Sequence, residues 1–415
     1  MRSGGKPRNL KENNVRMAME IIRKSEVFSI NDLSKVIQLS KTTIKKMIDL
    51  LTGQGLIVSA GKGESTEEGG KRPELFRFNP HMGYVVSAHV MPNSIWVATT
   101  DLNGRIQTME KYEVVENRDL SFLMEKLTTL IVSQIRGQKS GGQPIGLVVA
   151  LAALVDSTNQ ISLYSPHYPG WGRNVPFVEK LREGVEGFLG KGLSFPIFVD
   201  CVNRYQALAE KEKGIAVGVE NFIILDALDE GVGSGIVVDG KVKHGAHSLS
   251  GEIGHMTLDA ADGPLCICGN KGCFEALVSA RRVLSIAKER WKGAPGSPVP
   301  GKSWDEVSLE DICLAAADGE PLCRELIREV AHWFTVGLGN IMLVTDPELI
   351  VIQGQYVKTG EYFLELLREG VKRMGLPDVE KKVRIEYSFM GEDRGVLGAA
   401  MAVVNDFFTD RFFRG

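Results

Sequence analysis

The chain has 415 residues, of which 43% are hydrophobic and 24% charged, and this composition excludes an intrinsically disordered protein. The length is too great for one compact core and predicts two or three domains, one of them small. No run of about twenty apolar residues is present, and the basic N-terminus lacks the apolar segment of a signal peptide. We therefore expect no membrane contact and a cytoplasmic location.

The net charge of −3 is unevenly distributed along the chain. Residues 1–80 contain fifteen Lys or Arg against nine Asp or Glu, a balance of +6 that leaves −9 for the remainder. A basic unit on an acidic body predicts a polyanionic partner for that unit alone, because phosphate neutralisation drives non-specific affinity for nucleic acid.

Three amphipathic helices are predicted in the first 55 residues. Apolar residues recur at helical spacing within residues 9–25, 30–37 and 44–51, and Ser40 is a credible N-cap for the third helix. Two helices joined by a short turn form a helix-turn-helix, whose second helix enters the major groove of DNA. A polar helix face is often only solvated, but hydroxyls and cations also suit contacts to bases and phosphates. The candidate contacts are Ser40, Lys41, Thr42, Thr43, Lys45 and Lys46.

A wing is predicted directly after these helices. Residues 56–59 and 75–78 have the pattern of paired strands, and a long loop from Gly61 to Pro73 separates them. The two glycines before Lys71 and Arg72 allow a close approach to a nucleic-acid backbone, with both cations against phosphates or in the minor groove. Residues 1–80 are therefore predicted to be a winged helix-turn-helix domain that binds double-stranded operator DNA.

The remainder of the chain alternates strand-like and helical runs from Tyr84 onward. This alternation predicts an α/β architecture with helix-flanked sheets in two lobes, and such lobes bind ligands between them. The glycine-rich run Gly231–Gly235 follows a strand-like segment. Such a run can hold a phosphate or form a tight hairpin, and the hairpin is the favoured interpretation.

A cluster of cysteines is the most specific local motif. Gly251–His255 is followed after ten residues by a segment with three cysteines, and two glycines lie between the second and the third. One imidazole and three thiolates form a closed tetrahedral site, and the absence of a free position for water indicates structural zinc rather than catalytic zinc. Chance clustering of reduced cysteines is the alternative. The predicted ligands are His255, Cys266, Cys268 and Cys273.

Taken in order, the wing, the Gly231–Gly235 run, the Gly251–His255 segment and the cysteine cluster resemble the ROK family of repressors and sugar kinases. The resemblance covers nearly the whole chain and implies a two-lobed actin-like, hexokinase-like body after the winged helix. It implies a first lobe of residues 81–199 with 395–415, and a second lobe of residues 200–394 that carries the zinc site. It also implies a sugar site that includes two glutamates, Glu252 and Glu275. The alternative is that these glutamates only cap helices or carry surface charge. The candidate sugar-binding residues are Asp200, Asn203, Glu252, His255 and Glu275.

The chain departs from the kinases of this family at the positions for phosphate transfer. Their Asn-Asp-x-Asn motif, in which the Asp is the general base, corresponds to Asp200-Cys201-Val202-Asn203 here. Their first-lobe Asp-x-Gly-x-Thr turn corresponds to residues 88–92, where neither Asp nor Gly is present, and part of the nucleotide pocket is Gln353-Gly354. These losses predict a protein that is not an enzyme, because each would lower the rate by orders of magnitude.

We therefore expect a sugar-responsive transcription regulator, a repressor by resemblance. A homodimer or homotetramer would bind a palindromic operator, and a sugar or sugar phosphate would act through its differential affinity for two states. Two alternatives remain open. One is a bifunctional kinase with weak activity through Asp200, and the other is a repressor without a small-molecule effector.

Overall fold

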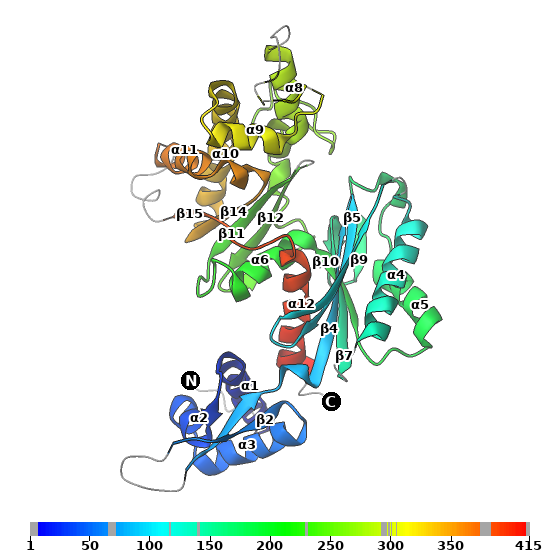
Figure 1. Cartoon of the computed structure of the whole chain (residues 1–415), viewed down its shortest axis with the longest axis vertical. Helices are drawn as coiled ribbons and strands as arrows, with labels where there is room; N and C mark the ends of the chain where they lie inside the picture. Colours follow the sequence, from blue (N-terminus) through cyan, green and yellow to red (C-terminus); the bar gives the residue numbers. More distant parts are fainter. Residues whose placement is uncertain are drawn as a thin grey trace.

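Figure 1 shows an N-terminal unit at the bottom of the view and two larger lobes above it, each built on a five-stranded sheet. The computed structural model describes residues 7–64, 72–115, 118–138, 142–228, 231–291, 297, 299, 301–303, 305–373 and 383–411. Within these ranges no helix is both long enough and apolar enough to cross a bilayer. The predicted fold class, a winged helix-turn-helix followed by a two-lobed α/β body, is confirmed.

The N-terminal unit packs three helices on a small antiparallel sheet of order β1-β3-β2. Gln38 has a φ of 57° and turns the chain, after which Ser40 caps the third helix by accepting a hydrogen bond from the Thr43 amide at 3.2 Å. Ile22 and Ile44 are fully buried in the core of the unit. Its elements are α1 (Pro7–Lys24), β1 (Phe28–Ser29), α2 (Ile30–Ile37), α3 (Lys41–Gly53), β2 (Ile57–Lys62) and β3 (Glu74–Phe78).

The first lobe has a sheet of order β10-β7-β4-β5-β6, in which β4, β7 and β10 are parallel and β5 and β6 antiparallel. Helices α4 and α5 pack together beside it, and β4 is buried along nearly its whole length because both faces of the sheet are covered. The elements are β4 (Gly83–Met91), β5 (Ser94–Asp101), β6 (Ile106–Glu113), α4 (Leu120–Gly137), β7 (Gln143–Leu151), β8 (Leu154–Asp156), β9 (Ile161–Tyr164), α5 (Phe177–Leu189) and β10 (Ile197–Cys201).

The second lobe has a sheet of order β13-β12-β11-β14-β15, with β11, β14 and β15 parallel. Leu228 pairs with Gly231, so the glycine-rich run is a strand of a hairpin, as favoured from the sequence. The elements are β11 (Phe222–Leu228), β12 (Gly231–Val238), β13 (Lys241–Val242), α7 (Phe274–Val278), α8 (Ala280–Arg290), α9 (Leu309–Ala317), α10 (Pro321–Thr345), β14 (Leu349–Gly354), α11 (Glu361–Lys372) and β15 (Arg384–Tyr387).

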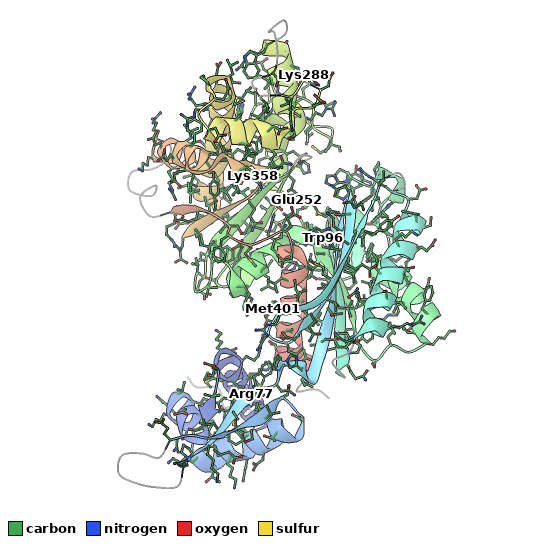
Figure 2. The ribbon with its side chains drawn as sticks, in the orientation of Figure 1. Arg77, Trp96, Glu252, Lys288, Lys358 and Met401 are labelled. Carbon is green, nitrogen blue, oxygen red and sulfur yellow. The ribbon has the colours of Figure 1, made fainter. Side chains whose placement is uncertain are left out.

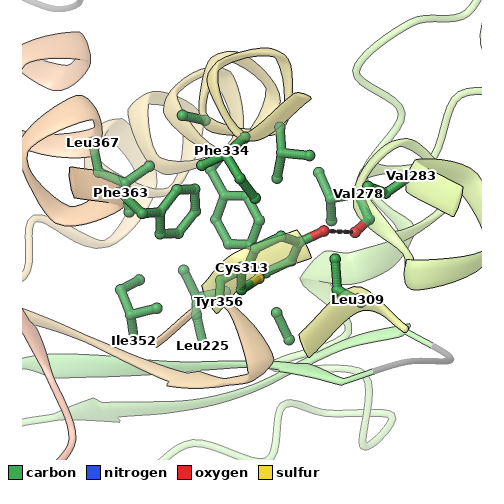
Figure 3. Close-up of a cluster of buried hydrophobic side chains, with 14 of the residues drawn as sticks. Leu225, Val278, Val283, Leu309, Cys313, Phe334, Ile352, Tyr356, Phe363 and Leu367 are labelled. Carbon is green, nitrogen blue, oxygen red and sulfur yellow. Dashed lines mark hydrogen bonds between the residues drawn. The ribbon is translucent and has the colours of Figure 1, made fainter. Parts of the chain in front are cut away.

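An aromatic cluster forms the centre of the second lobe (Figure 3). The ring of Phe334 makes edge-on contacts with Phe274, Tyr356 and Phe363 at centroid distances of 5.1, 5.3 and 5.2 Å. The Tyr356 hydroxyl donates to the carbonyl of Val278 at the end of α7. The core therefore fixes the short helix that directly follows the cysteine cluster.

Two helices connect the lobes, α6 (Val202–Lys213) and α12 (Arg394–Asp406). Helix α6 contacts β10 of the first sheet and β11 and β12 of the second, and α12 packs along α6 and over β4 and β7. A Cβ at Gly398 would lie 1.8 Å from the carbonyl oxygen of Tyr205, so only glycine permits this close approach of the two helices. Figure 1 shows α12 pointing from the region between the sheets toward the N-terminal unit.

Candidate functional site

Helix α3 presents a polar face that has the composition expected of a DNA-contacting surface. The residues predicted to contact DNA on this helix are exposed, whereas its apolar residues Ile44, Met47, Ile48 and Leu51 are buried. Ser40 and Thr43 also bond to each other, with 2.9 Å between their hydroxyl oxygens, so they stabilise the helix start. The exposed candidates are Ser40, Lys41, Thr42, Thr43, Lys45 and Lys46.

The wing is formed by β2 and β3, which pair in antiparallel register from Ile57 and Phe78. Arg72 is exposed at the start of the second wing strand, and Lys71 lies outside the described residues. Arg77 is exposed on β3 (Figure 2) and is a further cation of this unit that the sequence analysis did not select. Its place in a strand of alternating burial was the signal that could have identified it.

The four predicted metal ligands converge on one point of the second lobe. One ligand atom from each of His255, Cys266, Cys268 and Cys273 lies within 4.8 Å of the others. The Cys268 and Cys273 sulfurs are 3.6 Å apart, and the Cys266 sulfur is 3.7 Å from His255 Nδ1. Tetrahedral zinc with ordinary bond lengths requires S···S and S···N separations of about 3.8 and about 3.6 Å. The donor set and its spacing therefore fit zinc.

Tight backbone turns bring these ligands together. The Cys266 amide donates to the Asn270 carbonyl at 2.8 Å, and the Gly269 amide donates to the Cys266 carbonyl at 3.0 Å. A Cβ at Gly272 would lie 1.7 Å from the carbonyl oxygen of Asp259, so a larger residue cannot occupy this position without moving the backbone. These contacts explain why glycines separate the cysteines.

Glu275 and Glu252 lie beside this cluster. Glu275 Oε1 is 3.3 Å from His255 Nδ1 and 3.0 Å from the Cys266 sulfur, so Glu275 faces the side of the imidazole that belongs to the cluster. Burial raises the pKa of Glu252, the charges of His255 and Arg204 oppose this shift, and the charge of Glu275 adds to it. Glu252 is therefore close to both the cluster and α6, and Figure 2 shows it on the side of the second lobe that faces the first.

Asp200 is buried at the centre of a polar network between the lobes, in which Arg204 is also buried and His244 is partly exposed. Its Oδ1 accepts a hydrogen bond from Arg204 Nη1 at 2.6 Å, and its Oδ2 lies 2.8 Å from His244 Nε2. Arg204, which is 2% exposed, also donates to the Val155 carbonyl of the first lobe and to the Ser248 carbonyl of the second. Arg204 and His244 were missed from the sequence, although the four-residue spacing of Asp200 and Arg204 is typical of an ion pair.

The remaining residues of the altered kinase motif are unsuited to proton transfer. Burial, followed by the charge of Glu252, raises the pKa of Cys201 to about 12, so its thiol stays neutral at physiological pH. The Asn203 side chain donates to Gln206 at 2.9 Å and lies against β12, where a Cβ at Gly233 would be 2.2 Å from it. A neutral thiol of this kind is a poor general base.

A second buried network joins the start of α12 to the sheet of the second lobe. Arg394, the first residue of α12, donates to Asp226 of β11 at 3.2 Å and to Gln353 of β14 at 3.1 Å. Asp226 is 1% exposed and also accepts from Gln206 at 2.9 Å. Burial, followed by the charge of Arg394, lowers the pKa of His89 to about 3. Protein side chains therefore hold this region together, and the sequence analysis had not selected Asp226, Gln206 or Arg394.

A surface cavity of about 120 Å³ lies behind the metal cluster, between α7, α8 and α10. Its lining includes Leu277, Arg282 and Trp333, together with Asp259 and Pro264 of the loop that carries the cysteines. None of the candidate sugar residues lines it. The cavity is therefore separate from the interlobe networks.

Comparison with known proteins identifies the family. The sequence model of the ROK family matches residues 87–406. A protein named xylose repressor from Caldicellulosiruptor bescii is 29% identical over 399 residues, which cover 96% of each chain. A crystal structure of a ROK family transcriptional regulator, described as a homologue of the Escherichia coli Mlc protein, superposes with a TM-score of 0.81 at 25% identity and covers 98% of this chain and 100% of that one.

A kinase is similar to the body alone. A ROK family glucokinase from Streptomyces griseus, solved with glucose and AMPPNP, has a TM-score of 0.64 at 25% identity, and it covers 77% of this chain and 98% of its own. Together with the family match over more than three quarters of the sequence, these similarities identify the chain as a member of the ROK family.

Proposed function

We propose that the chain is a sugar-responsive transcription repressor that binds operator DNA through its winged helix. The observation that carries this proposal is the similarity to a protein named xylose repressor over 96% of both chains, which includes the N-terminal unit. The exposed cations and hydroxyls at the start of α3 support direct contact with DNA. The relative's name makes D-xylose the first effector to test.

The body is proposed to bind a ligand without transferring phosphate. Cys201 is neutral at the base position, and both oxygens of Asp200 are engaged by Arg204 and His244. These contacts argue against the bifunctional kinase, which requires Asp200 to accept a proton from the sugar. An assay of ADP release with ATP, Mg²⁺ and either D-xylose or D-glucose tests this part, and sugar-dependent turnover would contradict it.

The metal cluster is proposed to hold structural zinc through His255, Cys266, Cys268 and Cys273. When bound, the metal would supply a covalent link between the Gly251–His255 segment and the start of α7. Glu252, Glu275, Asp200 and Asn203 are the proposed sugar contacts, because carboxylates and amides pair with sugar hydroxyls. His255 would present its remaining ring nitrogen, Nε2, to the same ligand.

The domain limits and assembly are part of the proposal. Residues 1–80 form the DNA-binding domain, residues 81–199 with 395–415 the first lobe, and residues 200–394 the second lobe. The packing of α12 over β4 and β7 supports the return of the chain end to the first lobe. A cytoplasmic homodimer or homotetramer would place two winged helices on the two halves of a palindromic operator.

A reporter experiment tests the repressor proposal directly. A reporter gene is placed under the promoter beside the chain's own gene and measured with and without the chain, and with and without D-xylose. Lower expression with the chain, relieved by the sugar, is the expected result. Repression that no sugar changes would favour the repressor without an effector, and no repression would contradict the proposal.

A further inference from the structure

The N-terminal unit contacts the body through a small joint at the end of α12. Phe408 is 5% exposed, and its ring meets Phe78 of β3 edge-on at a centroid distance of 5.9 Å. The guanidinium of Arg23, near the end of α1, lies 5.0 Å from the centroid of the Phe408 ring and donates to Asn405 Oδ1 at 3.3 Å. One helix of the winged unit is thus attached to the last turn of α12.

The same joint reaches α6. The Asn405 side chain donates to Glu212 Oε1 at 2.9 Å, and Glu212 lies in the last turn of α6. The first turn of α6 carries Asn203 and Arg204, which belong to the interlobe site. A single helix of twelve residues therefore extends from the candidate sugar site to the contact with the DNA-binding unit.

Helix α12 is attached through side chains at both ends, to the second lobe at its start and to the winged unit at its last turn. Arg394 bonds to Asp226 and Gln353 of the second lobe, whereas Asn405 and the following residues meet the winged unit. The close contact at Gly398 couples the positions of α12 and α6, because interdigitated backbones have no free space between them. The two helices are a tightly packed pair with one end between the lobes and the other at α1.

The hydrogen-bond donors of the joint are not all paired among the described residues. Arg23 Nε is buried without a hydrogen-bond partner among the described residues. The side-chain hydrogen bond described for its guanidinium goes to a neutral amide oxygen. Arg23 is partly buried, and a buried donor without a partner is costly, so a second arrangement of the joint in which Arg23 Nε gains a partner can be close in free energy.

We propose that α6 and α12 act as a lever that transmits the state of the interlobe site to the winged helix through the joint of Arg23, Glu212, Asn405 and Phe408. This inference rests on the proposed function. A ligand that pulls the second lobe toward the first moves Arg204 and Arg394, and with them the two helix starts. The displacement reaches α1 at the joint and changes the position of the DNA-binding unit. The two positions then differ in their contacts with DNA, so the ligand can change DNA affinity.

The test uses the full chain, duplex DNA from beside its own gene, and D-xylose and D-glucose as probes. The measured quantity is the ratio of the operator Kd with sugar to that without sugar. A coupling of the usual size gives a ratio of about 5 to 150, and uncoupling brings it below about 2. Asn405→Ala and Arg23→Gln are expected to uncouple DNA binding from sugar binding and to lower the ratio below about 2. Lys24→Gln removes the adjacent exposed cation of α1 and is expected to keep the wild-type ratio. Wild-type ratios in both joint variants would overturn the lever.

A second measurement separates failure of the lever from failure of the proposed function. If the wild type binds no operator, or no probe changes its affinity, the repressor or effector assignment is wrong and the lever is examined by hydrogen exchange. Asp226→Asn weakens the attachment of α12 to the second lobe and is expected to speed amide exchange in α1 by more than about threefold. In the Asn405→Ala background the same substitution should leave α1 unchanged. An equal response of α1 in both backgrounds, or none in either, would overturn the lever.

Discussion

The ion pair between Arg394 and Asp226 is expected to contribute strongly to stability, and in an asymmetric manner. Replacement of Arg394 by Met leaves the Asp226 carboxylate, which is 1% exposed, with the Gln206 amide as its described side-chain partner. An uncompensated buried charge of this kind lowers the free energy of unfolding by about 3–5 kcal/mol. Asp226→Asn is milder, about 1–3 kcal/mol, because Arg394 keeps its bonds to Gln353 and to the Gly391 carbonyl.

Urea unfolding of the full chain, followed by circular dichroism, measures these effects. The double variant Asp226→Asn/Arg394→Met should recover part of the loss, because the isolated charge is removed, and this coupling distinguishes the pair from two independent defects. The exposed pair of Arg290 and Glu325 provides the matched control, since Glu325→Gln should cost less than about 1 kcal/mol. An Arg394→Met variant as stable as this control would refute the reasoning.

Three further predictions concern DNA, pH and metal. Lys45→Ala should reduce the slope of log K against log salt by about 1.8, as measured by operator titration, because each of the two winged helices on the operator loses one phosphate contact worth about 0.9. Neutral His89 is favoured by folding, since its pKa falls to about 3, so stability is complete above about pH 6.5 and declines by up to about 1.4 kcal/mol per pH unit as the pH falls toward 3. Urea titrations of His89→Leu should lack this decline. Cys273→Ser should abolish retention of zinc, as measured by mass spectrometry of the dialysed protein.

Matched variants control these three experiments. Lys180→Ala removes an exposed cation far from the winged unit in sequence and should leave the salt slope unchanged. His81→Leu removes an exposed histidine and should keep the acid-induced decline. Cys313→Ser alters a buried cysteine outside the cluster and should retain one zinc per chain. If a control variant has the same effect as the test variant that it is matched with, the corresponding assignment is contradicted.

Local sequence patterns predicted the features that depend on nearby residues. Ser40 caps α3 as its position before an amphipathic run indicated, and the four predicted metal ligands converge because the glycines among them permit tight turns. The pairing of Leu228 with Gly231 likewise joins two strands that are close in the sequence. In each case the partners are separated by few residues, so periodicity and spacing contain most of the information.

The interlobe networks could not be predicted, because their partners are distant in the sequence. Arg394 and Asp226 are 168 positions apart, and Asp200 and His244 are 44 apart. The packing of α6 and α12 between two sheets buries Asp200, Arg204 and Asp226, and a single sequence does not identify these three charges as buried. The same limitation concealed Arg23, since the tertiary contact with Phe408 was invisible in the pattern of α1.

The most direct test of the account is the affinity of the purified chain for duplex DNA from beside its own gene, measured by fluorescence anisotropy across a salt series with and without D-xylose and related sugars. The account predicts tight, salt-sensitive binding that exceeds the affinity for unrelated DNA by about a thousandfold or more and that one sugar changes. Equal affinity for operator and unrelated DNA, with no response to any sugar, would contradict it.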